Sequence, residues 1–172
     1  KEKARPWVID RRQFKEDGVG YLDRSRAHLY VLDARNGEPR QITFGDFEDS
    51  EPEWRPDGAE IAFVSNRTAE PDGNDNSDIW IVSAEPKAKA AALRRVTTNA
   101  GPDRAPTWSP DGTAIAYVTS TEPDLLWYAT NHLALTDAAG GEARLITKAL
   151  DRNINEPRFS AGGDKIIATV EN

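Results

Sequence analysis

Residues 108–118, WSPDGTAIAYV, repeat residues 54–64, WRPDGAEIAFV, and return in altered form at residues 159–169 as FSAGGDKIIAT. Each copy carries a proline two residues before its aromatic residue: Pro52, Pro106 and Pro157. These prolines are 54 and 51 residues apart. A repeat of this length, made of short strands and tight turns, is typical of the blades of a β-propeller. The sequence therefore predicts an all-β fold.

Each repeat divides into four short strands. The first carries the aromatic residue, the second is apolar, the third alternates, and the fourth ends in an apolar residue followed by threonine. The expected first strands are 51–54, 105–108 and 156–159; the second, 61–65, 114–120 and 165–170; the third, 28–33, 78–83 and 132–137; the fourth, 40–43, 94–97 and 144–147. Between the first two strands, Pro110, Asp111 and Gly112 suit a type I turn whose glycine takes a left-handed conformation.

These strands predict a fragment of a β-propeller with about three blades of four-stranded antiparallel sheets, all within one domain, 1–172. Residues 51–97 and 105–147 supply complete blades, whereas residues 7–43 and 156–172 supply a partial blade at each end. Propellers typically have four to eight blades. Two apolar faces and two strand edges are therefore expected to be open and to favour self-association. The chain begins at Lys1 and contains no methionine, which suggests a piece of a longer polypeptide.

Composition excludes several classes of partner. Acidic residues outnumber basic ones, 29 to 22, and the net charge is −7. Nucleic-acid binding requires a basic stripe, so nucleic acid is not expected as a partner. No apolar run approaches the ~18 residues of a membrane span and no signal peptide opens the chain, so no membrane association is expected. The chain has no cysteine, which excludes disulfides and suits the cytoplasm without excluding the periplasm.

Acidic residues are expected to gather on one face of the propeller, because the loops after the second and the fourth strands lie on the same side. This acidic set comprises Asp46, Glu48, Asp49, Glu51, Glu70, Asp72, Asp75, Asp103, Glu122, Asp124, Asp151 and Glu156.

The amino-acid sequence of the repeat resembles that of a known class of propellers. The order P-x-W-S-P-D-G-x-x-I-A-[FY]-x-S, then D-I-W-x-V, then a turn and L-T, is similar to the TolB-type repeat. Four further stretches resemble the N-terminal propeller of bacterial prolyl oligopeptidase-superfamily enzymes, particularly the acylaminoacyl-peptidase and dipeptidyl-aminopeptidase branch. They are residues 5–10 (RPWVID), 14–22 (FKEDGVGYL), 65–68 (SNRT) and 129–133 (ATNHL).

The resemblance implies a propeller that filters and orients oligopeptide substrates for a downstream α/β-hydrolase domain with a Ser-Asp-His triad. That domain is not in this sequence, which has no G-x-S-x-G and so no nucleophile elbow. The dipeptidyl branch holds the substrate's amino terminus with a pair of adjacent glutamates on its propeller. No Glu-Glu occurs here, so that role is assigned to no residue.

The two histidines, His28 and His132, open the third strand of their repeats, which indicates a structural role at a blade edge rather than catalysis. Residues 72–78 alternate oxygen ligands as a calcium loop does. However, Ser77 stands where an EF-hand needs glycine and Ser83 where it needs glutamate, so a solvated loop is preferred. The sequence thus predicts no catalytic, cofactor-binding or metal-binding residue in this chain.

Aromatic residues and arginines offer the remaining candidates. The repeat-equivalent Trp54, Trp108 and Phe159 are expected to be buried wedges between blades. Trp127 and Tyr128 lie outside the repeat, and either pack under a loop or face a ligand or partner. Arg24, Arg26 and Arg152 fall outside the strands and could clamp a carboxylate.

Two functions from different classes follow. The first is the substrate-gating part of an oligopeptide-hydrolysing serine peptidase, without catalysis of its own. The alternative is a TolB-like protein-interaction propeller with no enzymatic activity.

Overall fold

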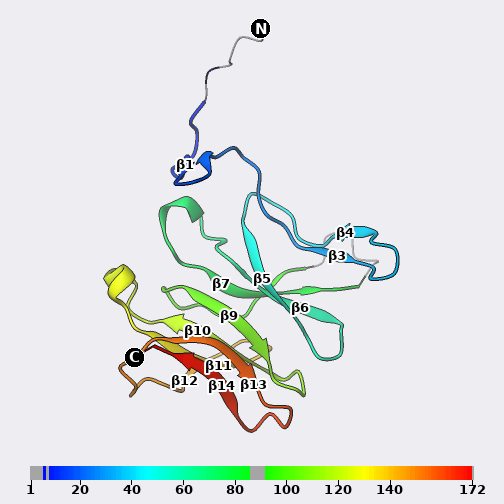
Figure 1. The fold of residues 1–172 in the computed structure, drawn as a ribbon, viewed down its shortest axis with the longest axis vertical. Coiled ribbons are helices and arrows are strands. Elements are labelled where there is room, and N and C mark those ends of the chain that lie inside the picture. The colour runs from blue at the N-terminus through cyan, green and yellow to red at the C-terminus, as the bar shows by residue number, and fades with distance from the viewer. Residues whose placement is uncertain (1–5, 7, 86–91, 172) are drawn as a thin grey trace.

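The computed structural model describes residues 6, 8–85 and 92–171, and the side chains of residues 126 and 127 are outside this description. The question of how Trp127 packs therefore lies outside the described residues. Within the described ranges the strands form five antiparallel sheets (Figure 1). In the same ranges, no helix is long and apolar enough to cross a membrane.

Four of these sheets follow the repeats, and we number them as blades. Blade 1 contains β3 (Tyr30–Leu32) and β4 (Pro39–Gln41); blade 2 contains β5 (Asp49–Trp54), β6 (Glu60–Ser65), β7 (Asp78–Ser83) and β8 (Arg94–Arg95); blade 3 contains β9 (Asp103–Trp108), β10 (Ala114–Ser120), β11 (Asn131–Asp137) and β12 (Arg144–Leu145); blade 4 contains β13 (Ile154–Phe159) and β14 (Ile166–Val170). Two short 3₁₀ helices, η1 (Pro71–Gly73) and η2 (Pro123–Tyr128), follow the second strands of blades 2 and 3.

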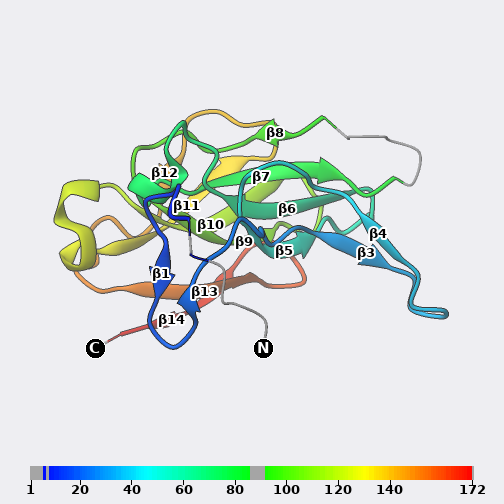
Figure 2. The same ribbon diagram turned by 90° about the horizontal axis from the view of Figure 1, so that it is seen from above.

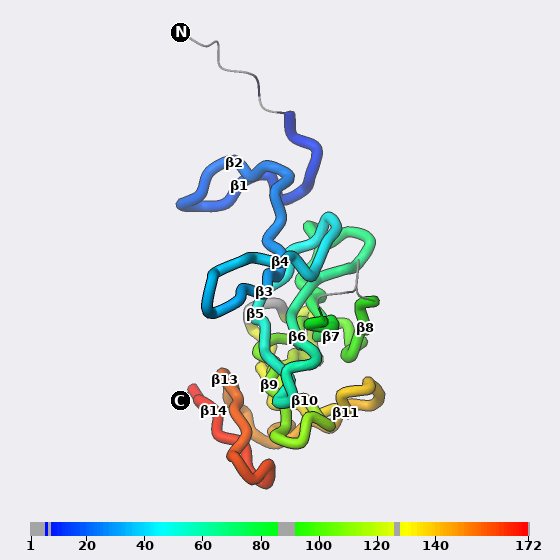
Figure 3. The backbone as a smooth tube through the Cα atoms, turned by 90° about the vertical axis from the view of Figure 1, so that its right-hand side faces the viewer, coloured from blue at the N-terminus to red at the C-terminus, as the bar shows by residue number. Residues whose placement is uncertain are grey.

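The fifth sheet is a small hairpin of β1 (Lys15–Glu16) and β2 (Gly20–Tyr21). Figure 3 shows this hairpin standing apart from blade 1 at the N-terminal end of the molecule. Of the residues expected to form the first partial blade, those between Tyr30 and Gln41 form its strands.

Successive blades pack face to face, and each interface has its own apolar cluster. Blades 1 and 2 share Leu29, Ile42, Ile61, Phe63 and Val82. Blades 2 and 3 share Ala62, Val64, Ile79, Ile81, Val96, Trp108, Ile115, Tyr117, Ala134 and Ala138. Blades 3 and 4 share Ala116, Leu133 and Ile154. The chain is therefore an all-β protein in which antiparallel sheets form an open, partial propeller, as the repeat predicts.

The alternation of side chains along a strand explains why adjacent residues join different clusters. In β6, Ile61 and Phe63 face blade 1, whereas Ala62 and Val64 face blade 3. A strand covered on both faces reads as a continuous apolar run, because neither side of its pleat meets water.

Threonine closes the outer edge of each repeat. The N–H of Leu29 donates to Thr43 Oγ1 at 2.8 Å, and the equivalent bonds from Ile79 to Thr97 and from Leu133 to Thr147 are both 2.9 Å long. The hydroxyl thus pairs a backbone donor where the fourth strand ends. This bond accounts for the threonine that ends each repeat.

The turns between first and second strands have the predicted geometry. Gly58, Gly112 and Gly163 have φ of 73°, 70° and 75°, and each N–H donates to the carbonyl three residues earlier. In the Ser109–Gly112 turn, Asp111 Oδ1 also accepts a bond from the Thr113 N–H at 3.0 Å.

The aromatic residues that directly precede these turns in the sequence differ in burial. Trp108 is buried, and its indole N–H donates to the carbonyl of Glu53 in β5 at 3.2 Å. Phe159 packs on the cluster between blades 3 and 4. Trp54 holds the equivalent place in blade 2 but is half exposed. Among the described residues, blade 1 contains only β3 and β4 and so offers no first strand on which the Trp54 ring could pack. The prediction of a buried wedge is therefore wrong for Trp54.

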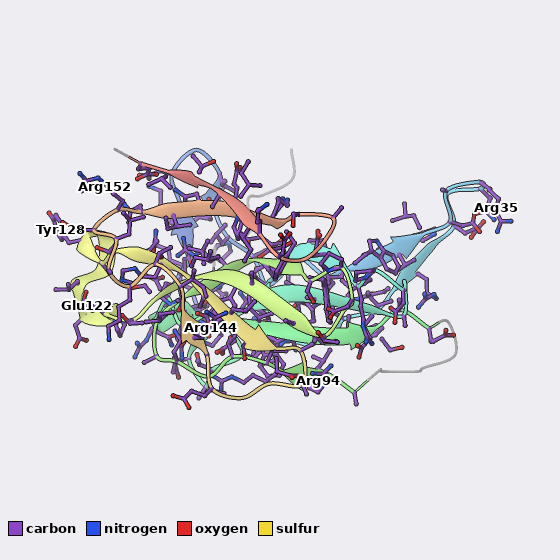
Figure 4. All side chains as sticks on the ribbon, turned by 90° about the horizontal axis from the view of Figure 1, so that it is seen from below. Arg35, Arg94, Glu122, Tyr128, Arg144 and Arg152 are labelled. Carbon is purple, nitrogen blue, oxygen red and sulfur yellow. The ribbon has the colours of Figure 1, made fainter. Side chains whose placement is uncertain are left out.

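The loops sort to two ends of the molecule. Figures 1 and 2 show η2 at one end and the β3–β4 hairpin at the other. Figure 4 shows Arg35 at the tip of that hairpin, opposite Glu122, Tyr128 and Arg152. The tight turns and the long loops therefore present separate surfaces.

Candidate functional site: the wall of inner strands

The first strands of blades 2, 3 and 4 form one wall, because β9 lies against both β5 and β13. Each of these strands has a kink at the same repeat position. Among the described residues, the non-glycine residues with positive φ are Glu51, Ala105 and Glu156, at 50°, 48° and 52°. Each stands directly before a proline, and the pairing with the second strand shifts register there.

Left-handed backbone at a residue with a side chain costs roughly 1–3 kcal/mol, and such strain concentrates at functional sites. A β-bulge with an extra residue redirects side chains at a strand edge. Three equivalent bulges in adjacent strands therefore make this wall the candidate functional site of the described chain.

A hollow of about 440 Å³ opens on the wall. It is lined by Glu51, Pro52, Glu53, Pro102, Arg104, Ala105, Pro106, Val118, Asn131, Asn155, Glu156 and Arg158. The lining carries two guanidinium groups, three carboxylates and two amides. The guanidinium groups suit a carboxylate, the carboxylates suit an ammonium group, and the amides suit the polar groups of a peptide backbone.

One carboxylate of the wall holds the next blade. Glu51 Oε2 accepts a hydrogen bond from the N–H of Ala105 at 2.5 Å, so the side chain at one bulge pairs the backbone at the following bulge. The methyl side chain of Ala105 has no acceptor with which to continue this arrangement toward blade 4. Among the described residues, no hydrogen bond or ion pair involves the Glu156 carboxylate, which therefore faces the hollow with its charge unpaired.

A pair of acids lies behind the wall, between blades 2 and 3. Asp103 is fully buried, and no donor in the described chain reaches its carboxylate with hydrogen-bonding geometry. Burial raises the pKa of Asp103 to about 6, and the nearby polar groups of Thr119, Thr97 and Asn99 offset only part of that effect. Burial also raises the pKa of Asp78, although Arg95 Nη2 donates to it at 2.8 Å.

At the equivalent place between blades 1 and 2 the acid has basic partners. His28 Nδ1 lies 3.1 Å from Asp49 Oδ2, and Arg67 Nη2 donates to Asp49 Oδ1 at 2.6 Å. The guanidinium of Arg67 also lies over the rings of Phe47, Phe63 and Trp80. The other histidine, His132, has a buried Nδ1 without a partner among the described residues. Each histidine thus lies at the start of the outer strands of its own blade, and the structure does not bring either to the hollow.

Arginines balance much of the acidic loop face. Arg11 donates from Nε and Nη2 to the two carboxylate oxygens of Asp72, at 2.9 and 2.8 Å. These bonds hold the pKa of Asp72 below its ordinary value. Arg26 is nearly buried and donates to Asp46 at 2.7 Å, which likewise lowers the pKa of Asp46.

The residues considered for a calcium loop are therefore engaged elsewhere: Asp72 by Arg11 and Asp78 by Arg95. In the described ranges no group of three or more acidic or histidine side chains is placed to hold a metal ion.

The three arginines singled out from the sequence do not converge. Arg24 pairs with Asp10, and Arg26 belongs to the network around Asp72. Arg152 donates to the carbonyl of Asp151. Tyr128 projects from the end of η2 and is almost fully exposed (Figure 4).

Sequence reasoning missed the arginines that do line the hollow, Arg104 and Arg158. The signal that could have found them is the proline two residues before each aromatic. This proline lies in the inner strand of its blade, and the residues beside it in the sequence face the same wall in every repeat.

Comparisons with known proteins show which folds this arrangement of strands is similar to. No family model matches the chain. A search of solved structures finds the crystal structure of TolB from Acinetobacter baumannii, with a TM-score of 0.63 and 20% identity, covering 83% of this chain and 32% of that one. It also finds a putative TolB from Agrobacterium tumefaciens, with a TM-score of 0.56 and 26% identity, covering 69% of this chain and 40% of that one. The fold is that of a TolB-like propeller.

Two curated proteins are distant relatives in sequence. The uncharacterized peptidase YuxL of Bacillus subtilis is 28% identical over 121 residues, which are 70% of this chain and 17% of YuxL. The uncharacterized protein Atu1656 of Agrobacterium fabrum is 26% identical over 142 residues, which are 80% of this chain and 45% of that protein. The chain thus spans less than half the length of either relative.

Proposed function

We propose that this chain is the substrate-gating part of the propeller of an oligopeptide-hydrolysing serine peptidase of the acylaminoacyl-peptidase type. In this proposal it admits and orients extended peptides, and a downstream α/β-hydrolase domain cleaves them. The observation that carries the proposal is the similarity to YuxL, a protein named a peptidase, over 70% of this chain.

The chemistry of the wall supports peptide binding. An extended peptide offers backbone N–H and C=O groups along its length and opposite charges at its two ends. The hollow offers Arg104 and Arg158 for a carboxylate, Glu156 for an ammonium group, and the amides of Asn131 and Asn155 for backbone groups.

Fluorescence anisotropy tests this proposal. A fluorescein-labelled hexapeptide with a free carboxyl terminus should bind the chain, and the double variant Arg104→Ala/Arg158→Ala should bind at least ~10-fold more weakly, since a hydrogen bond to a charged group contributes about 1.5–3 kcal/mol. The matched control is Arg35→Ala, which removes an exposed guanidinium at the far end of the molecule (Figure 4). Equal loss in both variants, or no binding at millimolar peptide, would contradict the proposal.

The alternative is a TolB-like interaction propeller without a peptidase partner, which the two TolB structures favour. It predicts that the chain binds a folded protein through its loops and ignores short peptides. Under either proposal the chain alone should not hydrolyse acyl-peptide or dipeptide chromogenic substrates, because it has no nucleophile elbow. Turnover that persists in the presence of a serine-reactive phosphonate would contradict both.

A further inference from the structure

The three bulges of the inner wall are equivalent in backbone but not in side chain. Glu51, Ala105 and Glu156 have φ of 50°, 48° and 52°, and each directly precedes a proline. β9 lies between β5 and β13 (Figure 3). The wall therefore contains two junctions between consecutive bulges: the first from β5 to β9, and the second from β9 to β13.

At the first junction, a carboxylate of the protein pairs the backbone. A bulge leaves its extra residue outside the ladder of hydrogen bonds, and the pairing of β9 with β10 passes from Arg104 directly to Thr107. Glu51 extends toward blade 3, and its Oε2 accepts a hydrogen bond from the Ala105 N–H at 2.5 Å. The Glu51 carboxylate is thus the partner that the ladder does not supply to this N–H.

At the second junction, the equivalent place has no acceptor. The pairing of β13 with β14 passes from Asn155 to Arg158, so Glu156 lies outside the ladder as Ala105 does. The residue that would extend toward the Glu156 N–H is Ala105, whose side chain is a methyl group. Among the described residues, no side chain accepts a hydrogen bond from the Glu156 N–H. This junction therefore has the backbone donor without the carboxylate.

Two arginines line the hollow at the second junction. Arg104 directly precedes the bulge in β9, and Arg158 follows the bulge in β13. The Arg104 guanidinium makes no hydrogen bond or ion pair within the described chain, and that of Arg158 donates only to the carbonyl of Pro157, at 2.8 Å. Blade 2 has Ser50 and Glu53 at the equivalent positions. Positive charge thus gathers at the junction that lacks a carboxylate of its own.

We propose that the second junction binds the free α-carboxylate of a peptide. The peptide's carboxylate takes the place that the Glu51 carboxylate has at the first junction. One of its oxygens accepts a hydrogen bond from the Glu156 N–H, and Arg104 and Arg158 supply the cationic donors, since guanidinium groups bind carboxylates through paired N–H groups. This inference rests on the proposed role of the wall in peptide binding and specifies which group of the peptide is held and where.

The remaining negative charge of the hollow does not oppose this assignment. Glu51 extends from its bulge toward the following blade, and a Glu156 side chain that extends in the same direction carries its charge away from the junction with β9. From that junction the hollow continues across β9 to Pro52 and Glu53 of β5, which gives the rest of the peptide a path along the wall.

A site of this kind selects the ends of chains. A segment in the middle of a polypeptide has no α-carboxylate, whereas every short peptide presents one. The substrate class that follows is oligopeptides with an unmodified carboxyl terminus, held at that end.

Isothermal titration calorimetry with unlabelled peptides tests the assignment. An acetylated hexapeptide of alanine and serine with a free carboxyl terminus should bind at least ~10-fold more tightly than its carboxyl-terminal amide, because the amide lacks the charge. Equal affinities of acid and amide would overturn this inference and leave the proposed function standing. No binding of either peptide at millimolar concentration would overturn both. An amide with one internal glutamate that binds as tightly as the acid would contradict the assignment to a chain end.

Ala105→Glu tests the position of the site, because it supplies the missing carboxylate from the protein itself. Glutamate has this backbone conformation at both equivalent bulges, so the substitution is compatible with the turn. The variant should bind the acid no more tightly than the amide, and its melting temperature should rise by roughly 2–4 °C. The control Ala139→Glu adds the same charge in the exposed β11–β12 turn and should leave the preference for the acid unchanged. A preference for the acid that persists in Ala105→Glu would overturn the proposed position.

Discussion

Gly112 has φ = 70° in the turn between β9 and β10, and a Cβ built there would lie 2.8 Å from Arg55 Nε. A β-branched side chain is strained in this conformation. Gly112→Val should therefore lower the free energy of unfolding by at least ~1 kcal/mol. The matched control is Gly162→Val in the third turn, where φ is not left-handed and a Cβ meets only Asp164 at 3.4 Å. Urea denaturation of both variants checks this, and equal midpoints would refute the assigned turn geometry.

The same turn shows which residues can be predicted from sequence. The sequence Pro-Asp-Gly restricts the backbone locally, so Gly58 and Gly112 could be assigned before the fold was known. Trp54 could not be assigned, because its burial depends on whether the preceding blade has an inner strand. The buried state of Asp103 depends in the same way on side chains from blade 2. The backbone conformation of a turn can therefore be predicted from the repeat itself, whereas the burial of a side chain depends on the residues of the neighbouring blades.

Asp103 should make stability depend on pH with an unusual sign. Its pKa is about 6 in the folded protein and near the ordinary 3.8 in the unfolded chain. Between these values the folded state binds more protons, so the free energy of unfolding falls as pH rises from about 4 to 6 and is level above that. A shift of about two units corresponds to roughly 3 kcal/mol.

Asp103→Asn removes this ionisation. The variant should be more stable than wild type at pH 7.5, and the difference should disappear as the pH approaches 4. Asp111 is the control: a hydrogen bond from Ser109 lowers its pKa, so Asp111→Asn should be less stable than wild type at neutral pH. Thermal melting across pH 4 to 8 measures both. A wild type more stable than Asp103→Asn at pH 7.5 would contradict the burial of an unpaired carboxylate.

At the scale of single strands, the bulges of the inner wall allow two equivalent glutamates to be compared. Glu51 and Glu156 have the same left-handed conformation, but only Glu51 accepts a bond from the next blade, at Ala105. Glu51→Ala should destabilise the protein by about 1 kcal/mol more than Glu156→Ala, because a backbone donor loses its partner. Chemical denaturation measures the difference. Equal losses would indicate that strain at the bulge, and not the hydrogen bond, governs the stability of this wall.

The strands also show which features of the fold can be predicted from the sequence and which cannot. The second and third strands of blades 2 and 3 follow from their apolar runs. The inner strands begin two residues before the predicted 51–54 and 105–108, because the bulges at Glu51 and Ala105 interrupt the pattern that marks a strand. A residue before proline is ordinarily extended, and nothing local reveals the left-handed turn. The hollow, which depends on these bulges, was not predictable for the same reason.

At the scale of the whole molecule, stability should decrease outward from the interface between blades 2 and 3. That interface holds the largest apolar cluster among the described residues, and its central strands β6, β7, β10 and β11 are covered on both faces. Blades 1 and 4 are each covered on one face. Regions with fewer buried contacts open at lower free energy. Hydrogen exchange should therefore find the slowest amides in the four central strands.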